Sequence, residues 1–210
     1  MFRYEKQKQK LGFDYIIGCD EVGRGSLAGP VVAGAVLFKI DDLVSKKLSW
    51  HGKVADSKKL TSKSRLLLND VVTESAHRFG IGQVSHLQVD NLNIHNATLL
   101  AMHKAVQEIL KISGIDVDKV LVCVDGRFEI PKLHMAQEAV IDGDDLIFSV
   151  SAASIVAKVY RDNLMMKLDK KFPGYDFGKH KGYGTQTHIR AIQKNGLSSI
   201  HRKSFCKKYV

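Results

Sequence analysis

The chain has 210 residues, of which 44% are hydrophobic and 26% are charged, a composition that is typical of a folded globular protein and excludes a disordered chain. No apolar stretch approaches the length that crosses a bilayer, no apolar segment follows the charges of the first ten residues, and the three cysteines lack CxxC spacing. These features argue against a membrane protein, a secretory signal, a disulfide framework and a zinc site, so we expect a cytoplasmic protein.

Basic residues are concentrated at one end of the chain. The net charge is +10, and residues 151–210 contain 13 basic and 3 acidic residues, whereas the first 150 residues contain 19 of each. This asymmetry indicates an anionic partner, most simply a nucleic-acid backbone. The alternative is a solvated basic surface that only keeps the protein in solution.

Strands and helices are predicted to alternate along the chain. In chain order, the patterns predict strands at 15–20 and 31–39, a polar loop at 41–59, a helix from Thr61 or Ser62 to about 77, a strand at 79–84, a helix at 97–112, strands at 119–125 and 138–141, and helices at 151–171 and 185–194. The first helix has an expected apolar stripe of Leu66, Leu67, Val71 and Val72. The alternation predicts one α/β domain over residues 1–210, with a mixed β-sheet flanked by helices. The basic helical part, from about 165 to 210, is expected to lie beside the sheet.

Three predicted strands end in carboxylates that are followed closely by glycine. They are Asp20 with Glu21, then Asp125, then the run DGDD at 142–145. Asp is also common in turns at the ends of strands, so coincidence is an alternative explanation of this pattern. Adjacent side chains on a strand point to opposite faces, so Asp20 and Glu21 are expected to share a site only if the extended chain breaks there. If the acids converge, their oxygens favour Mg²⁺ or Mn²⁺, and two such ions about 4 Å apart are the usual arrangement for phosphodiester hydrolysis.

Two glycine-containing loops carry further candidates. The segment GRGSLA at 23–28 matches a dinucleotide-binding pattern, but a strand follows it instead of a helix, and no P-loop spacing is present. It is either a tight turn that binds a phosphate or a sugar hydroxyl, or a plain hairpin connection. The loop KHKGYGT at 179–185 combines cations with an aromatic ring, as nucleic-acid sites do. His180 and His188 are either metal ligands or structural residues, and the cationic loop DSKKL at 56–60 is unremarkable by itself.

Taken together, these motifs resemble ribonuclease HII, the bacterial type within the type 2 ribonuclease H family. The matching segments are DEVGRGSLAGPVVAGAV at 20–36, DSKKL at 56–60, LNIHNATLLAM at 92–102, VDG at 124–126, GD at 143–144 with SAASIVAKVYRD at 151–162, FGKHKGYGT at 177–185 and IHRKSF at 200–205. They span nearly the whole chain, and the combination of the first segment with HKGYGT is highly specific for this family. The related type III enzymes lack the arginine of the first motif.

The resemblance implies a ribonuclease H-like fold and an endonuclease that cleaves the RNA strand of RNA–DNA hybrids and incises 5′ of ribonucleotides embedded in duplex DNA. It implies four catalytic, metal-binding carboxylates, which are Asp20, Glu21, Asp125 and Asp144, holding two Mg²⁺ or Mn²⁺ ions. It also implies that Gly23, Arg24 and Gly25 read the 2′-hydroxyl, that Tyr183 stacks near that sugar, and that Ser57, Lys58 and Lys181 hold phosphates.

One departure from the family pattern bears on the site. The family usually has Lys-Gly-Asp where this chain has Asp142-Gly143-Asp144, so an acid replaces an expected phosphate-binding cation. Two other classes remain as alternatives: a nucleic-acid-binding module without catalysis, and a different nuclease or recombinase on the same fold. We expect a monomer that needs no membrane and no obligate protein partner.

Overall fold

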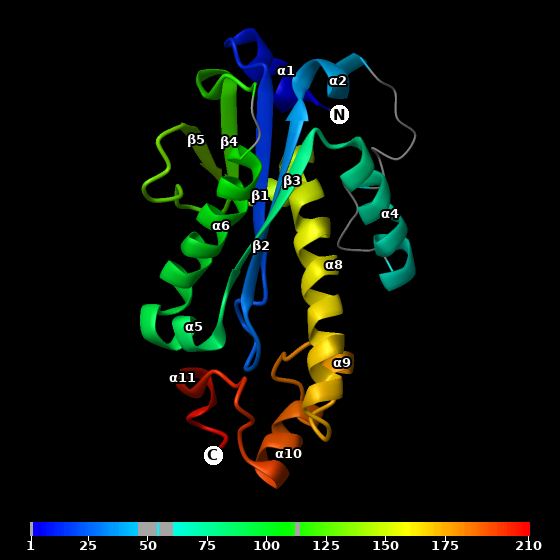
Figure 1. The fold of residues 1–210 in the computed structure, drawn as a ribbon, viewed down its shortest axis with the longest axis vertical. Coiled ribbons are helices and arrows are strands. Elements are labelled where there is room, and N and C mark those ends of the chain that lie inside the picture. The colour runs from blue at the N-terminus through cyan, green and yellow to red at the C-terminus, as the bar shows by residue number, and fades with distance from the viewer. Residues whose placement is uncertain (1, 46–53, 55–60, 112–113) are drawn as a thin grey trace.

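The computed structural model describes residues 2–45, 54, 61–111 and 114–210, and its strands form a mixed five-stranded sheet in the order β3-β2-β1-β4-β5 (Figure 1). The strands are β1 (Tyr15–Val22), β2 (Val31–Lys39), β3 (Arg78–Val84), β4 (Val120–Asp125) and β5 (Ala136–Val140). β2 is antiparallel to both β1 and β3, whereas β4 runs parallel to β1 and to β5. The predicted mixed sheet flanked by helices is therefore confirmed.

Helices cover both faces of the sheet. The long helix α8 (Phe148–Lys171) and α4 (Ser62–Ser75) lie on one face, and α6 (Ile94–Leu110), preceded by α5 (His86–Leu92), lies on the other (Figure 1). The remaining helices are α1 (Arg3–Lys10), α2 (Ile40–Ser45), the 3₁₀ turn η2 (Val117–Lys119), α7 (Gly143–Leu146), α9 (Phe177–His180), α10 (Gln186–Asn195) and α11 (Lys203–Cys206).

Alternation along the strands assigns each side chain to one of these two faces. Ile17 and Cys19 pack in the core beneath α6, whereas Ile16 packs in the core beneath α8. The backbone of α8 comes very close to β1 at Gly18, where an added Cβ would lie 2.0 Å from the carbonyl carbon of Ser149. A residue without a side chain is therefore required at Gly18, and α8 lies directly against the strand that leads to Asp20.

Several predicted elements needed correction. The helices α1, α2, α5, α7, α9 and α11 were not predicted. α2 occupies the start of the segment expected to be a loop at 41–59, and most of that segment lies outside the described residues. Thr61 caps α4 as expected, accepting a hydrogen bond from the Ser64 N–H. The predicted apolar stripe of α4 was wrong at Leu66 and Leu67, which are exposed, and the helix buries Leu68. Three consecutive leucines fit more than one helical face, so periodicity alone could not choose between them.

The C-terminal elements were expected beside the sheet, but only α8 lies there. The helices α9, α10 and α11 are gathered beyond the end of β1 and β2 at which the Gly23–Pro30 segment connects these two strands (Figure 1). Backbone hydrogen bonds join the two regions: the Leu27 N–H donates to the Gly182 carbonyl at 2.8 Å, and the Gly29 N–H donates to the Ile200 carbonyl at 2.9 Å. The C-terminal part is thus packed against the loop that follows the first acidic motif.

Three buried histidines form a chain within this C-terminal part. The rings of His180 and His188 stack with 4.3 Å between centroids, and the Nε2 atoms of His188 and His201 lie 3.0 Å apart. His188 donates from Nδ1 to the Tyr183 carbonyl, and His201 accepts at Nδ1 from the Ser198 N–H, so His201 donates to His188 at the shared contact. These hydrogen bonds require neutral rings and assign the histidines a structural role.

We predict that this histidine chain makes the fold sensitive to acid. Burial lowers the pKa of both His188 and His201 from 6.5 to about 4. Between pH 6.5 and 4 the unfolded chain therefore takes up protons that the folded chain does not, so stability falls as the pH falls. Thermal unfolding at pH 7 and pH 5 should show a loss of roughly 2 kcal/mol per histidine from this source, and His201→Gln should lose less on acidification than the wild type. An equal loss in the two proteins would contradict the prediction.

Candidate active site

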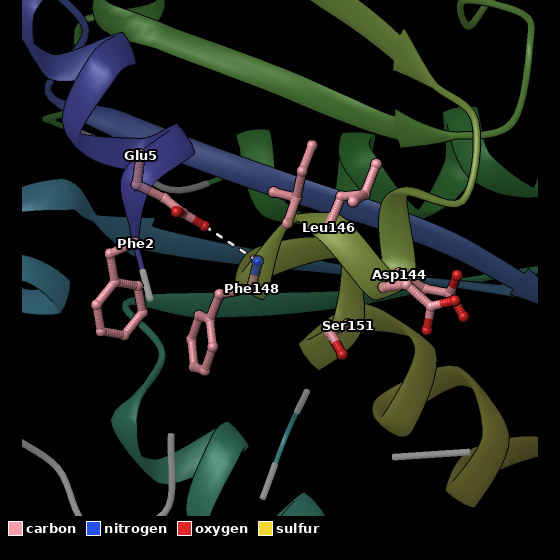
Figure 2. Close-up of a pocket in the computed structure, with 8 residues that line it drawn as sticks. Phe2, Glu5, Asp144, Leu146, Phe148 and Ser151 are labelled. Carbon is pink, nitrogen blue, oxygen red and sulfur yellow. Dashed lines mark hydrogen bonds between the residues drawn. The ribbon is translucent and has the colours of Figure 1, made fainter. Parts of the chain in front are cut away.

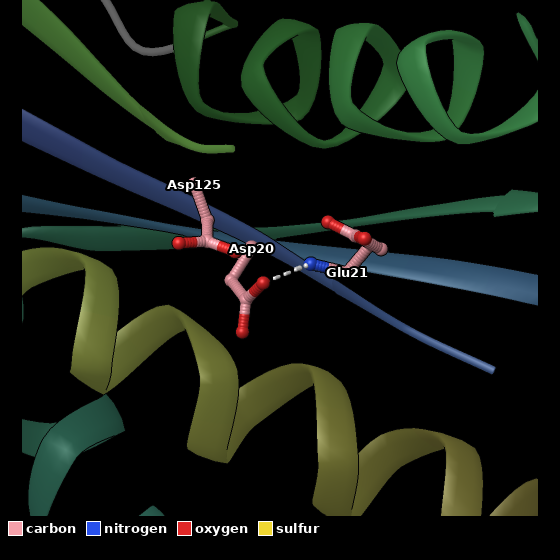
Figure 3. Close-up of side chains that lie close together, drawn as sticks. All are labelled: Asp20, Glu21 and Asp125. Carbon is pink, nitrogen blue, oxygen red and sulfur yellow. Dashed lines mark hydrogen bonds between the residues drawn. The ribbon is translucent and has the colours of Figure 1, made fainter. Parts of the chain in front are cut away.

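The carboxyl ends of β1 and β4 bring two aspartates together. The parallel register pairs Cys19 with Val124, so the residues that follow, Asp20 and Asp125, stand next to each other on neighbouring strands. Their position in the alternation places both on the face covered by α8, and Figure 3 shows the Asp20 side chain pointing toward that helix. Ligands of α/β proteins commonly bind at this end of parallel strands.

Glu21 joins the two aspartates without a break in the strand. β1 remains extended to Val22 and stays paired with β2, so the expectation that the chain must leave the extended form after Asp20 was wrong. The pairing of β1 with β4, however, ends at Cys19, so the edge of β1 beside Glu21 is open. One ligand oxygen from each of Asp20, Glu21 and Asp125 lies within 4.8 Å of the others (Figure 3).

Asp144 follows a residue that contacts this group but is not part of the group. The N–H of Gly143 donates to Oδ1 of Asp125 at 2.8 Å, so the start of α7 is held directly against the acidic cluster. Asp144 itself lines a cavity of about 170 Å³ together with Glu5 and Phe148 (Figure 2). The structure therefore brings three of the four expected carboxylates together and ties the fourth to them through one backbone hydrogen bond.

The electrostatics of the cluster are unfavourable without a cation. Burial raises the pKa of Asp20 well above the usual carboxyl range, and the negative charges of Glu21 and Asp125 raise it further. Hydrogen bonds from the Ser154 hydroxyl and the Glu21 N–H oppose this change. Burial also raises the pKa of Glu21, against the lowering effect of Arg24, whose Nη1 lies 3.0 Å from Oε1 of Glu21. Three close carboxylates with oxygen-only donors are the set that Mg²⁺ or Mn²⁺ fits, so these residues suit a hard divalent cation.

The expected substrate-binding residues of two loops lie side by side. Gly23 has φ +90°, a conformation that glycine adopts freely, and it starts the turn that contains Arg24 and Gly25. A backbone bridge joins Ser26 of that loop to Tyr183, which lies two residues beyond Lys181. The glycine turn and the aromatic residue of the 179–185 loop thus form one surface next to Glu21. Ser57 and Lys58 lie outside the described residues.

Sequence reasoning assigned no role to two residues that contact the site. Ser154 lies within the segment SAASIVAKVYRD at 151–162 and hydrogen-bonds the carboxylate of Asp20. A single serine in a predicted helix does not by itself indicate a functional role. Glu5 lies on a helix that was not predicted, and its buried carboxylate accepts from the N–H of Phe148 at the start of α8 (Figure 2). It therefore fixes the junction of α7 and α8, next to Asp144.

Comparison with known proteins identifies the family of this chain. The family model for ribonuclease HII matches residues 17–208. A curated ribonuclease HII of Dehalococcoides mccartyi is 44% identical over 201 residues, covering 96% of this chain and 90% of that protein. One of Caldicellulosiruptor saccharolyticus is 41% identical over 206 residues, covering 98% and 94%.

The chain belongs to the ribonuclease HII family. It is accordingly a metal-dependent nuclease that cleaves RNA endonucleolytically in RNA–DNA hybrids. The resemblance drawn from the motifs is thereby confirmed, and the non-catalytic module is not supported. None of the described helices has the length and apolarity needed to span a membrane.

Solved structures show the same fold. The ribonuclease H2 of Pyrococcus horikoshii matches with a TM-score of 0.70 at 22% identity, covering 93% of this chain and 96% of that one. The ribonuclease HII of Archaeoglobus fulgidus, solved in complex with PCNA, matches with a TM-score of 0.72 at 25% identity, covering 91% and 94%. A ribonuclease HIII solved with Mn²⁺ matches with a TM-score of 0.71 at 18% identity, covering 96% and 71%.

We predict that Asp20→Asn stabilises the protein in EDTA. The substitution keeps an oxygen acceptor for the Glu21 N–H but removes a buried charge that Glu21 and Asp125 repel. The free energy of unfolding should rise by about 1 kcal/mol, or ~2–4 °C in Tm. Saturating Mg²⁺ or Mn²⁺ should raise the Tm of the wild type more than that of the variant. The exposed Asp118 provides the control, because Asp118→Asn should change neither quantity. A variant that is less stable than the wild type in EDTA would contradict the account.

Proposed function

We propose that this chain, besides hydrolysing the RNA strand of RNA–DNA hybrids, incises duplex DNA on the 5′ side of a single embedded ribonucleotide, leaving 3′-hydroxyl and 5′-phosphate ends. The observation that carries the proposal is the position of the acidic cluster directly beside the Gly23–Gly25 turn. Arg24 of that turn contacts Glu21 of the cluster at 3.0 Å. A phosphodiester held at the carboxylates would therefore have its neighbouring sugar at the glycine turn.

Asp20, Glu21, Asp125 and Asp144 are proposed to hold two Mg²⁺ or Mn²⁺ ions. When bound, such ions activate the attacking water and stabilise the charge on the leaving oxygen. The protein's own part is to fix the geometry before substrate arrives: β1 and β4 position Asp20 and Asp125, and the Gly143 N–H holds the Asp125 carboxylate in orientation. Positioning and charge stabilisation supply most of the catalysis in reactions of this kind.

Sugar recognition is assigned to the two adjacent loops. Backbone groups of Gly23, Arg24 and Gly25 are proposed to hydrogen-bond the 2′-hydroxyl, which distinguishes RNA from DNA. Tyr183 is proposed to stack near the same sugar, and the cationic side chains of Lys158 and Arg161 lie 5.9 and 5.6 Å from its ring. Lys181, Ser57 and Lys58 are proposed to hold phosphates, which fixes the register of the duplex without reading its sequence.

The cleavage assay uses a labelled DNA duplex with one ribonucleotide, beside an all-DNA duplex of the same sequence. We expect incision 5′ of the ribonucleotide with Mg²⁺ or Mn²⁺, none with EDTA, and an intact all-DNA control.

Asp125→Asn should retain duplex binding and lose at least about 10³-fold in cleavage rate, because it keeps the shape of the site while removing a metal-binding charge. Equal cutting of both duplexes would refute the reading of the 2′-hydroxyl, and wild-type cleavage by Asp125→Asn would refute the assignment of the metal ligands.

Asp142 gives a second test, through substrate affinity. This exposed acid precedes Gly143 at the edge of the site, and its left-handed backbone (φ 55°) is one that Lys132 and Lys181 also adopt in this chain. Asp142→Lys should therefore be tolerated and should tighten duplex binding several-fold at low salt, with a steeper salt dependence, because a cation replaces an anion near phosphate. Asp118→Lys makes the same charge change at the far end of β4 and should have a smaller effect. Equal effects of the two substitutions would contradict a local role for position 142.

A further inference from the structure

Two arginines of the C-terminal region are completely buried, which is unusual for this residue type. Arg161 lies on α8 and Arg202 lies just before α11, and both have 0% exposure. Within the described part of the chain neither takes part in an ion pair. The hydrogen-bond partners of both guanidinium groups are backbone carbonyl oxygens, and only Nη2 of Arg202 lacks a partner among the described residues. Burying a cation is costly unless hydrogen bonds compensate it, so these contacts must be specific.

The carbonyls that the two arginines bind belong mainly to one loop. Arg161 donates from Nε to the Pro30 carbonyl at 3.0 Å and from Nη2 to the Ala28 carbonyl at 3.3 Å. Arg202 donates from Nε to the Gly29 carbonyl at 3.0 Å and from Nη1 to the Arg24 carbonyl at 2.8 Å. The loop from Gly23 to Pro30 is thus held at both its start and its end by side chains that are distant in sequence.

Arg161 also links this loop to the 179–185 loop, and Arg202 makes one further contact with the Gly23–Pro30 loop. Arg161 also donates from Nη1 to the Lys181 carbonyl at 2.9 Å, and its guanidinium lies 5.6 Å from the centre of the Tyr183 ring. The Arg202 N–H donates to the Leu27 carbonyl at 2.8 Å. An added Cβ at Gly23 would lie 2.1 Å from Nε of Arg161, so the glycine turn packs directly on this guanidinium. Any shift of Arg161 would therefore move both loops.

A lysine could not replace either arginine in this arrangement. Each guanidinium donates from more than one edge of a rigid planar group to carbonyls at separate positions, whereas an ammonium is a single point. Burial lowers the pKa of Arg202 to about 10, so it remains a cation at neutral pH and its hydrogen bonds are charge-assisted, which makes them stronger than neutral ones.

We propose that Arg161 and Arg202 are positioning residues for sugar recognition. Arg161 holds the Gly23–Pro30 loop against the Lys181–Tyr183 turn, and Arg202 holds the same loop at Arg24 and Gly29. Together they set how strongly the protein distinguishes a ribonucleotide from a deoxyribonucleotide. Neither arginine touches the substrate in this scheme. The proposal rests on the proposed function, because it assumes that the glycine turn meets the 2′-hydroxyl. It predicts a loss of discrimination, whereas a purely structural role predicts a loss of stability alone.

The test compares Arg161→Lys and Arg202→Lys with the wild type. For each protein, the dissociation constants of the single-ribonucleotide duplex and of the matched all-DNA duplex are measured in Ca²⁺, together with single-turnover cleavage in Mg²⁺ and the Tm. The discrimination ratio is the dissociation constant of the all-DNA duplex divided by that of the single-ribonucleotide duplex. We expect each variant to lower this ratio at least fivefold, while the dissociation constant of the all-DNA duplex changes less than twofold. Cleavage of the ribonucleotide duplex should slow at least tenfold.

The control is Val106→Ala, a core substitution on the α6 face that is far in sequence from both loops and lowers stability without touching either arginine. It should lower the Tm and leave the ratio unchanged. If the arginine variants keep the wild-type ratio, or if Val106→Ala lowers it equally, the positioning role is wrong while the proposed function stands. A wild type that binds both duplexes equally and does not cleave overturns the proposed function and the positioning role with it.

Hydrogen exchange of the wild type tests whether the two arginines hold the Gly23–Pro30 loop, even if a lysine variant does not fold. The amides of Leu27 and Gly29 donate to carbonyls of the C-terminal part, so a loop held by two arginines should exchange them nearly as slowly as amides of the β1–β2 ladder. Exchange at the rate of an open surface loop would overturn the proposal. In any lysine variant that folds, these two amides should exchange at least tenfold faster while the ladder amides keep their rates.

Discussion

The parallel pairing of β1 and β4 is the constraint on which the rest of the site depends. It sets Asp20 and Asp125 at the same level and on the same face of the sheet, and the end of the β4 ladder leaves room for Glu21 beside them. Like charges at this distance repel, and α8 removes one of them from water. The sheet therefore has to be stable enough to hold an arrangement that is unfavourable until a divalent cation binds, as is typical of functional sites.

The C-terminal region carries structural contacts as well as positive charge. Its chain runs back to the loop after the acidic motif, and the buried guanidinium groups of Arg161 and Arg202 bind carbonyls of that loop. Part of the basic excess of residues 151–210 is therefore structural and does not face a phosphate. The histidine chain through His188 stabilises the same region with neutral rings. Charge counting alone could not separate these internal cations from those on the surface.

Much of the fold could be predicted because long elements with clear periodicity decide it. β2 covers the predicted residues 31–39, and α8 contains the helix predicted at 151–171. The short helices α1 and α5 were missed, since α1 is mostly polar and is held by tertiary contacts such as that of Glu5 with α8. The expected break after Asp20 was wrong because β4 pairs with β1 only as far as Cys19, which leaves the edge of β1 open beside Glu21. The position of Asp144 outside the cluster depends on the α7 turn, which no periodicity describes.

The central claim is that the carboxylates at the ends of β1 and β4 form the metal site. The most direct measurement is the anomalous difference density of crystals of the protein soaked in Mn²⁺, with Ca²⁺ soaks as the comparison. The account predicts a peak in contact with carboxylate oxygens of Asp20 and Asp125, on the side of the cluster that faces the Gly23–Gly25 turn. A crystal without a peak there, or with Mn²⁺ bound only at the exposed Asp145 of α7, would contradict it.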